Sequence, residues 1–123
     1  MTKNIKISKK GPKSEPPAED TITAAEVKKM LDDNKDFKLL DIRSEPEFRM
    51  MHIEGAQFTT RELVDQIFSK WPKDTEIVLY DHKGPQGLMG VQALVEKGFT
   101  RIKAMAGGID AWSEQIDPLI PRY

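Results

Sequence analysis

Two continuous apolar runs constrain the fold of this chain most: "KLLDIR" at residues 38–43 and "EIVLY" at residues 76–80. Runs of this length without polar alternation are typical of strands that are buried on both faces of a parallel sheet. A third run, "RIKAM" at residues 101–105, has a similar character. Helical patterns separate the three runs, so we expect an α/β domain with a mainly parallel central sheet of about five strands flanked by helices.

The predicted helices carry clear start and stop signals. Thr23 and Glu26 have the spacing of a capping box, and Ser44 and Glu47 repeat that spacing. Helices are therefore expected to begin after Thr23 and after Ser44. A further helix after residue 84 should end at Gly98, which suits a left-handed cap. Its buried face is predicted to contain Leu88, Val91, Leu94 and Val95.

The length and charge of the chain limit the domain number and the partners that we expect. A chain of 123 residues has room for one domain. The first 13 residues hold five lysines and no acid, and prolines follow, so we expect a basic tail or linker at residues 1–20 and a domain at residues 21–123. The net charge of −1 disfavours nucleic acid and acidic membranes as partners. No secretory signal is evident, so we expect a cytoplasmic location.

The chain contains no cysteine. This absence rules out disulfides, thiolate metal sites, persulfides and thiol nucleophiles within the chain. Any sulfur chemistry that needs a thiolate must therefore be supplied by another molecule.

The stretch "IVLYDHKGPQG" at residues 77–87 is the strongest candidate for a site. An apolar strand stops at Asp81, His82 and Lys83, and a glycine-rich turn from Gly84 to Gly87 leads into a helix. In α/β proteins, ligands bind at the carboxyl ends of the strands, and helix N-termini favour anions. The sequence therefore predicts an anion-binding or reactive loop at this junction.

Three stretches in order resemble the rhodanese family, the single-domain sulfurtransferase fold: "LLDIRSEPEF" with "HIEGA", then "IVLYDHKGPQG", then "GFTRIKAMAGGIDAW". The resemblance covers about residues 21–118. In that family a catalytic cysteine follows the central strand, and an arginine late in the loop binds the anionic substrate. The resemblance implies that Asp81 stands in place of the cysteine and Gln86 in place of the arginine. The whole loop is then a degenerate active site: Asp81, His82, Lys83, Gly84, Pro85, Gln86 and Gly87.

Sulfur transfer needs a polarisable thiolate, and a carboxylate oxygen cannot replace it. We therefore expect a catalytically inactive rhodanese-like domain that acts as a protein-binding or regulatory module linked to sulfur transfer. It would need no cofactor and hold no metal, and its partner would be a protein that the sequence does not identify. The Asp81 carboxylate is expected to fill the anion cradle itself, because backbone N–H groups from about Lys83 to Gly87 should converge on it.

Two alternatives remain open. Asp81 could act as a carboxylate nucleophile in phosphoryl transfer, with His82 and Lys83 as the adjacent groups. Asp81, His82 and His52 could instead form a weak metal or anion site, although they have no recognised ligand spacing. Asp41 and Arg43 are expected to flank the pocket together with His52, and to tie neighbouring loops together.

Overall fold

A computed structural model describes residues 20–123 of the chain. The predicted tail at residues 1–20 therefore lies, apart from Asp20, outside the described residues. Strands and helices alternate along the described part, in the order β1 (Thr21–Ile22), α1 (Ala24–Asp32), β2 (Lys38–Asp41), α2 (Glu45–Met50), β3 (Gln57–Phe58), α3 (Arg61–Lys70), β4 (Ile77–Tyr80), α4 (Pro85–Glu96), β5 (Ile102–Met105) and α5 (Gly108–Gln115).

The strands form one sheet in the order β1-β5-β4-β2-β3, and every neighbouring pair is parallel. The predicted α/β class and the sheet of about five strands are confirmed. Strand β4 lies at the centre, between β2 and β5, and Asp41 of β2 pairs in register with Tyr80 of β4. The carboxyl ends of the two strands therefore meet at one edge of the sheet.

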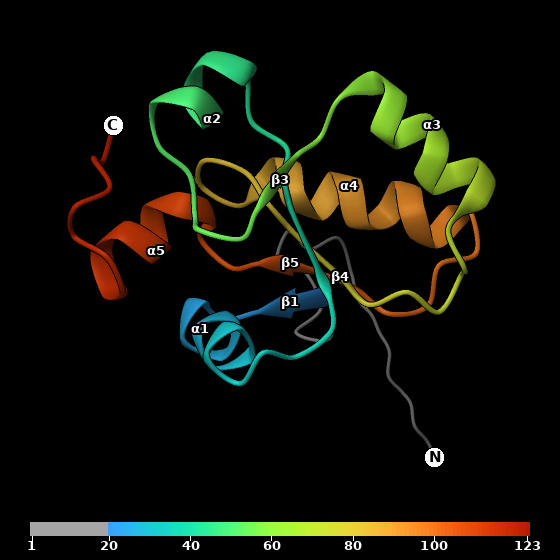
Figure 1. Ribbon diagram of the computed structural model, residues 1–123, viewed down its shortest axis with the longest axis horizontal. Helices are drawn as coiled ribbons and strands as arrows, with labels where there is room; N and C mark the ends of the chain where they lie inside the picture. Colours follow the sequence, from blue (N-terminus) through green and yellow to red (C-terminus); the bar gives the residue numbers. More distant parts are fainter. Residues whose placement is uncertain (1–19) are drawn as a thin grey trace, which may run out of the picture.

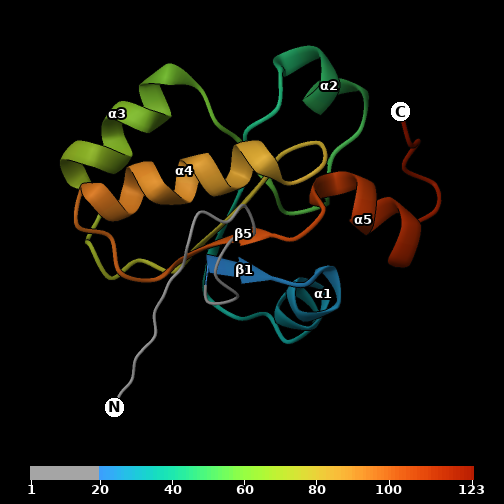
Figure 2. The same cartoon turned by 180° about the vertical axis from the view of Figure 1, so that it is seen from behind.

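Helices cover both faces of the sheet (Figures 1 and 2). Helices α1 and α5 lie on one face and α3 and α4 on the other, as the right-handed crossovers between parallel strands require. The burial of β4 explains its sequence, because all four of its residues are buried and Val78 and Tyr80 face one core while Ile77 and Leu79 face the other. A fully apolar strand is the expected result of such two-sided burial.

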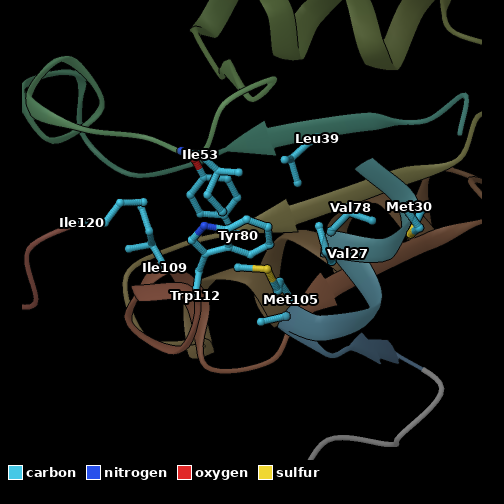
Figure 3. Close-up of a cluster of buried hydrophobic side chains, with 11 residues drawn as sticks. Val27, Met30, Leu39, Ile53, Val78, Tyr80, Met105, Ile109, Trp112 and Ile120 are labelled. Atoms are coloured by element: carbon cyan, nitrogen blue, oxygen red, sulfur yellow. Dashed lines mark hydrogen bonds between the residues drawn. The ribbon is translucent and has the colours of Figure 1, made fainter. Parts of the chain in front are cut away.

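The core beneath α1 and α5 supports the candidate loop. Figure 3 shows Tyr80 and Trp112 side by side in this core, with Ile109 and Ile120 close to them. The Tyr80 hydroxyl accepts a hydrogen bond of 3.2 Å from the backbone N–H of Ile53. Ile120, in the segment after α5, is buried in the same core.

The capping predictions are confirmed at both helix starts. The hydroxyls of Thr23 and Ser44 accept bonds from the backbone N–H groups of Glu26 and Glu47, and both glutamates return the bond to the cap residue. Gly98 follows α4 with a φ of 99°, as predicted.

One burial prediction is wrong. Val95 was expected in the core, but its side chain is 53% exposed. Successive residues of a helix point about 100° apart, so Leu94 and Val95 cannot both lie at the centre of one narrow apolar face. Leu94 occupies the core and leaves Val95 at the surface.

Among residues 20–123, no helix is long and apolar enough to cross a membrane.

Candidate functional site

The candidate loop leaves the central strand directly. Asp81 follows the last residue of β4, and α4 begins at Pro85, so only three residues separate the acid from the helix. Lys83, Pro85 and Gln86 are exposed, whereas Asp81 and Gly87 are buried. The loop therefore presents its polar side chains to solvent and turns the acid inward.

Asp81 is 4% exposed, and its carboxylate accepts two backbone hydrogen bonds. The N–H of Gly84 donates to Oδ1 at 2.8 Å, and the N–H of Gln86 donates to Oδ2 at 2.8 Å. Gln86 lies in the first turn of α4, where the positive end of the helix dipole also favours a negative charge. The predicted convergence of loop N–H groups on Asp81 is thus present for Gly84 and Gln86.

Glycine is required at two points around this loop. Gly84 has a φ of 124°, and Gly108 has a φ of 61°. A Cβ atom on Gly108 would lie 2.5 Å from the carbonyl carbon and oxygen of His82. This close approach lets the first turn of α5 bind the loop backbone: Ile109 N–H donates to the Asp81 carbonyl at 2.9 Å and Asp110 N–H to the His82 carbonyl at 3.0 Å. The first turn of α5 therefore holds the backbone of the loop at Asp81 and His82 in place.

Asp41 and Arg43 form a buried ion pair beside the loop. The Arg43 Nε atom donates to both Asp41 oxygens at 3.1 Å, and Nη2 donates to Oδ2 at 2.8 Å. The Arg43 side chain is 3% exposed and its Nη2 also donates to the Met51 carbonyl at 2.7 Å. The pair therefore ties the end of β2 to the segment after α2, which is the linking role expected for it.

Tyr80 lies under this ion pair. Burial, and then the nearby Asp41 carboxylate, raise the pKa of the Tyr80 hydroxyl above its ordinary value. Burial alone would lower the pKa of the Arg43 guanidinium, but its hydrogen bonds to Asp41 and Tyr123 outweigh burial and raise it. Tyr80 is thus held neutral and Arg43 charged.

The C-terminal segment reaches back to the loop. The Tyr123 ring stacks on the His82 imidazole, with the ring centroids 3.8 Å apart and the planes 8° apart. Its hydroxyl donates to Glu47 and accepts a bond of 3.1 Å from Nη1 of Arg43. Hydrogen bonds from Tyr123 and then Ser44 lower the pKa of Glu47 to about 2. Tyr123 therefore links α2 to the candidate loop.

His52 is not brought to the loop residues by any direct contact. Its ring stacks on Phe48 with centroids 3.8 Å apart, and its Nδ1 atom lies 2.8 Å from the Phe48 carbonyl. Within residues 20–123, no group of three or more histidine or carboxylate side chains is arranged to hold a metal ion. The metal alternative therefore has no support from the described residues.

Sequence reasoning missed the contribution of Tyr123. Its partners His82, Glu47 and Arg43 lie 41, 76 and 80 residues away in the chain, so no local pattern signals the contact. The aromatic residue near the end of the sequence was the only available sign.

Comparison with known proteins agrees with this architecture. The model of the rhodanese-like domain family matches residues 23–115. The chain is 32% identical over 105 residues to "Probable adenylyltransferase/sulfurtransferase MoeZ" of Mycobacterium tuberculosis, with 84% of this chain covered and only 27% of that protein. It is 28% identical over 99 residues to "Sulfurtransferase" of Allochromatium vinosum, with 80% of this chain and 92% of that protein covered.

A solved structure of a rhodanese-like domain has a similar fold. The solution structure of the rhodanese-like domain from the Alr3790 protein of Anabaena superposes with a TM-score of 0.69 at 29% identity, covering 77% of this chain and 74% of that one. The sheet order, the position of the loop after the central strand and the family match all indicate the same fold. The chain belongs to the rhodanese-like domain family.

Proposed function

We propose that this chain is a catalytically inactive rhodanese-like domain that acts as a protein-binding or regulatory module in a sulfur-transfer system. The observation that carries the proposal is the carboxylate of Asp81, whose two oxygens accept the N–H groups of Gly84 and Gln86. The resemblance implies that a persulfide would occupy this place in an active member. Here a fixed acid uses the same kind of donors.

The chemistry of sulfur transfer supports inactivity. A sulfane sulfur is carried on a thiolate and released by exchange, and this chain has no cysteine. Gln86 is exposed and uncharged, so it offers no charge-assisted contact to an anionic sulfur donor. The two groups that the family chemistry needs are therefore both missing from the loop.

The relatives support the link to sulfur transfer. The M. tuberculosis and A. vinosum proteins are both named as sulfurtransferases. This chain spans about a quarter of the length of the former, 27% of it. The names of these relatives and the partial coverage both fit a domain that works together with a separate sulfur-carrying protein.

Phosphoryl transfer by Asp81 has weaker support. A nucleophilic carboxylate needs a free oxygen facing the substrate, yet both oxygens of Asp81 accept short backbone bonds in a buried position. Incubation with acetyl phosphate and Mg²⁺ should therefore leave the mass of the protein unchanged.

The inactive state is tested by restoring the missing groups. Thiosulfate:cyanide sulfurtransfer is measured for the native protein, Asp81→Cys, and Asp81→Cys with Gln86→Arg. We expect no turnover by the native protein, little by the single variant and more by the double variant, because a charge-assisted bond contributes about 1.5–3 kcal/mol. Turnover by the native protein above a protein-free blank would overturn the proposal.

The binding role needs a separate test. Affinity purification from native cells, with mass spectrometry of the bound proteins, should recover a specific partner. A co-purifying sulfur-transfer protein would support scaffolding in that system. If this chain recovers only proteins that an unrelated bait of similar charge also recovers, the binding role is contradicted.

A further inference from the structure

Tyr123 lies in a site that is built to hold a phenol. The imidazole of His82 provides a flat stacking surface at 3.8 Å, Arg43 provides a donor to the hydroxyl at 3.1 Å, and Glu47 provides an acceptor. These three groups come from the β4–α4 loop, the segment between β2 and α2, and helix α2. Stacking, one donor and one acceptor together match the ring and the hydroxyl of a tyrosine side chain.

The donor of this site is unusually well fixed. The Arg43 side chain is almost completely buried, and Asp41 and the Met51 carbonyl hold its Nε and Nη2 atoms. Nη1 is left to face the phenol hydroxyl. Because its geometry is set by groups other than Tyr123, the donor should stay in place when Tyr123 leaves.

The occupant is held much less firmly than the site. Tyr123 is 54% exposed, and its side chain contributes to neither of the two hydrophobic cores. Arg122 is attached separately, through bonds of 2.9 and 3.1 Å to Asp110. Removal of the Tyr123 ring should therefore empty the site without unfolding the domain.

An apolar groove of about 320 Å³ adjoins the phenol site. Its lining includes Arg43 and Glu47 themselves, together with Pro46, Met50, Met51, Ile120 and Pro121. Met50 is highly exposed, and methionine surfaces adapt to different apolar partners. A chain whose tyrosine entered the phenol site could place neighbouring apolar side chains in this groove.

We propose that His82, Arg43 and Glu47 form a tyrosine-binding site, which Tyr123 fills in the free protein and which a tyrosine-bearing segment of a protein partner fills in the complex. This inference rests on the proposed binding function and names its surface. An attached side chain competes at an effective concentration in the millimolar range. A partner must therefore add contacts in the groove to displace Tyr123, so the site selects a tyrosine flanked by apolar residues.

The two histidines of the chain provide the test. His82 stacks on Tyr123 and His52 on Phe48, both at 3.8 Å, so both imidazole signals are shifted by a neighbouring ring. In Tyr123→Ala at constant pH, we expect the His82 proton signals to move toward their unstacked positions while those of His52 stay. Addition of p-cresol should then return the His82 signals saturably, with a dissociation constant in the millimolar range typical of so small a ligand.

Matched probes separate the hydroxyl contacts from simple apolar binding. Toluene lacks the hydroxyl, and it should bind Tyr123→Ala about tenfold more weakly or worse, because it loses hydrogen bonds to charged groups. Tyr123→Phe should keep the stacking shift of His82, which shows that the ring alone produces it. The native protein should not respond to p-cresol at concentrations that saturate Tyr123→Ala.

The proposal is overturned if p-cresol leaves His82 unmoved in Tyr123→Ala, if toluene binds equally well, or if the native protein binds p-cresol as tightly as the variant. None of these results depends on a natural partner. Tyr123→Ala removes the internal competitor and should strengthen the binding of a recovered partner. A recovered partner whose binding is not strengthened by Tyr123→Ala would likewise refute this site but leave the binding function standing. If Tyr123→Ala binds p-cresol but no partner is recovered, the tyrosine site is supported and the proposed binding function is contradicted.

Discussion

Replacement of Asp81 by alanine should destabilise the domain by about 2–4 kcal/mol. The change removes the acceptor of two hydrogen bonds of 2.8 Å, from the N–H groups of Gly84 and Gln86. Each buried donor left without a partner costs about 1–3 kcal/mol, so the full range is about 2–6 kcal/mol. Gly84 is half-buried and Gln86 is exposed, so water can reach part of the emptied space, and we expect the lower half of that range.

Urea unfolding followed by circular dichroism measures this loss from the midpoint and the slope of the transition. Asp65→Ala is the matched control, because Asp65 is an exposed acid on α3, away from the loop. Its effect should stay within about 0.5 kcal/mol. If Asp81→Ala destabilised the protein no more than Asp65→Ala, the loop N–H groups would not depend on the carboxylate, and the account of the loop would be wrong.

Three further predictions concern the surroundings of the site. The pKa of Glu47 is lowered from 4.5 to about 2 in the folded protein, so its contribution to stability is fully present above pH 4.5 and is lost as the pH falls through about 2. Glu47→Gln should therefore flatten the acid limb of a curve of stability against pH between these values. An unchanged acid limb would contradict this role of Glu47. Gly108→Ala should destabilise the fold by at least about 2 kcal/mol more than Gly98→Ala in thermal or urea unfolding, because both have positive φ but only Gly108 brings a Cβ within 2.5 Å of the His82 backbone; equal losses would show that the approach of α5 to the loop is not tight. Asp41→Asn should lower the free energy of unfolding by about 3–5 kcal/mol by leaving the buried Arg43 charge unpaired, and a loss below about 1 kcal/mol would mean that water reaches the pair.

The sequence predicts most of the sheet because its longer strands have distinctive patterns. β2, β4 and β5 have four residues each and coincide with the three apolar runs. The edge strands β1 and β3 have two residues each and show no periodicity that could reveal them. Both capping boxes could be predicted because each depends on only two residues, three positions apart in the sequence.

The loop was predictable only in its local part. The contacts of Asp81 with Gly84 and Gln86 span three and five residues, so the sequence and the family resemblance together predict them. The stacking of Tyr123 on His82 and its bonds to α2 depend on how the chain end crosses the folded domain. Such long-range contacts follow from the packing of complete elements, and no spacing in the sequence encodes them.

The central claim is that the Asp81 carboxylate occupies the anion cradle of the loop. The most direct measurement is an NMR titration with sulfate at constant ionic strength, in which the amide signals of Gly84 and Gln86 are followed in the native protein and in Asp81→Ala. Both amides donate to Asp81 in the native protein, so we predict no saturable shift there and a saturable shift of both in Asp81→Ala. Saturable sulfate binding by these two amides in the native protein would contradict the claim.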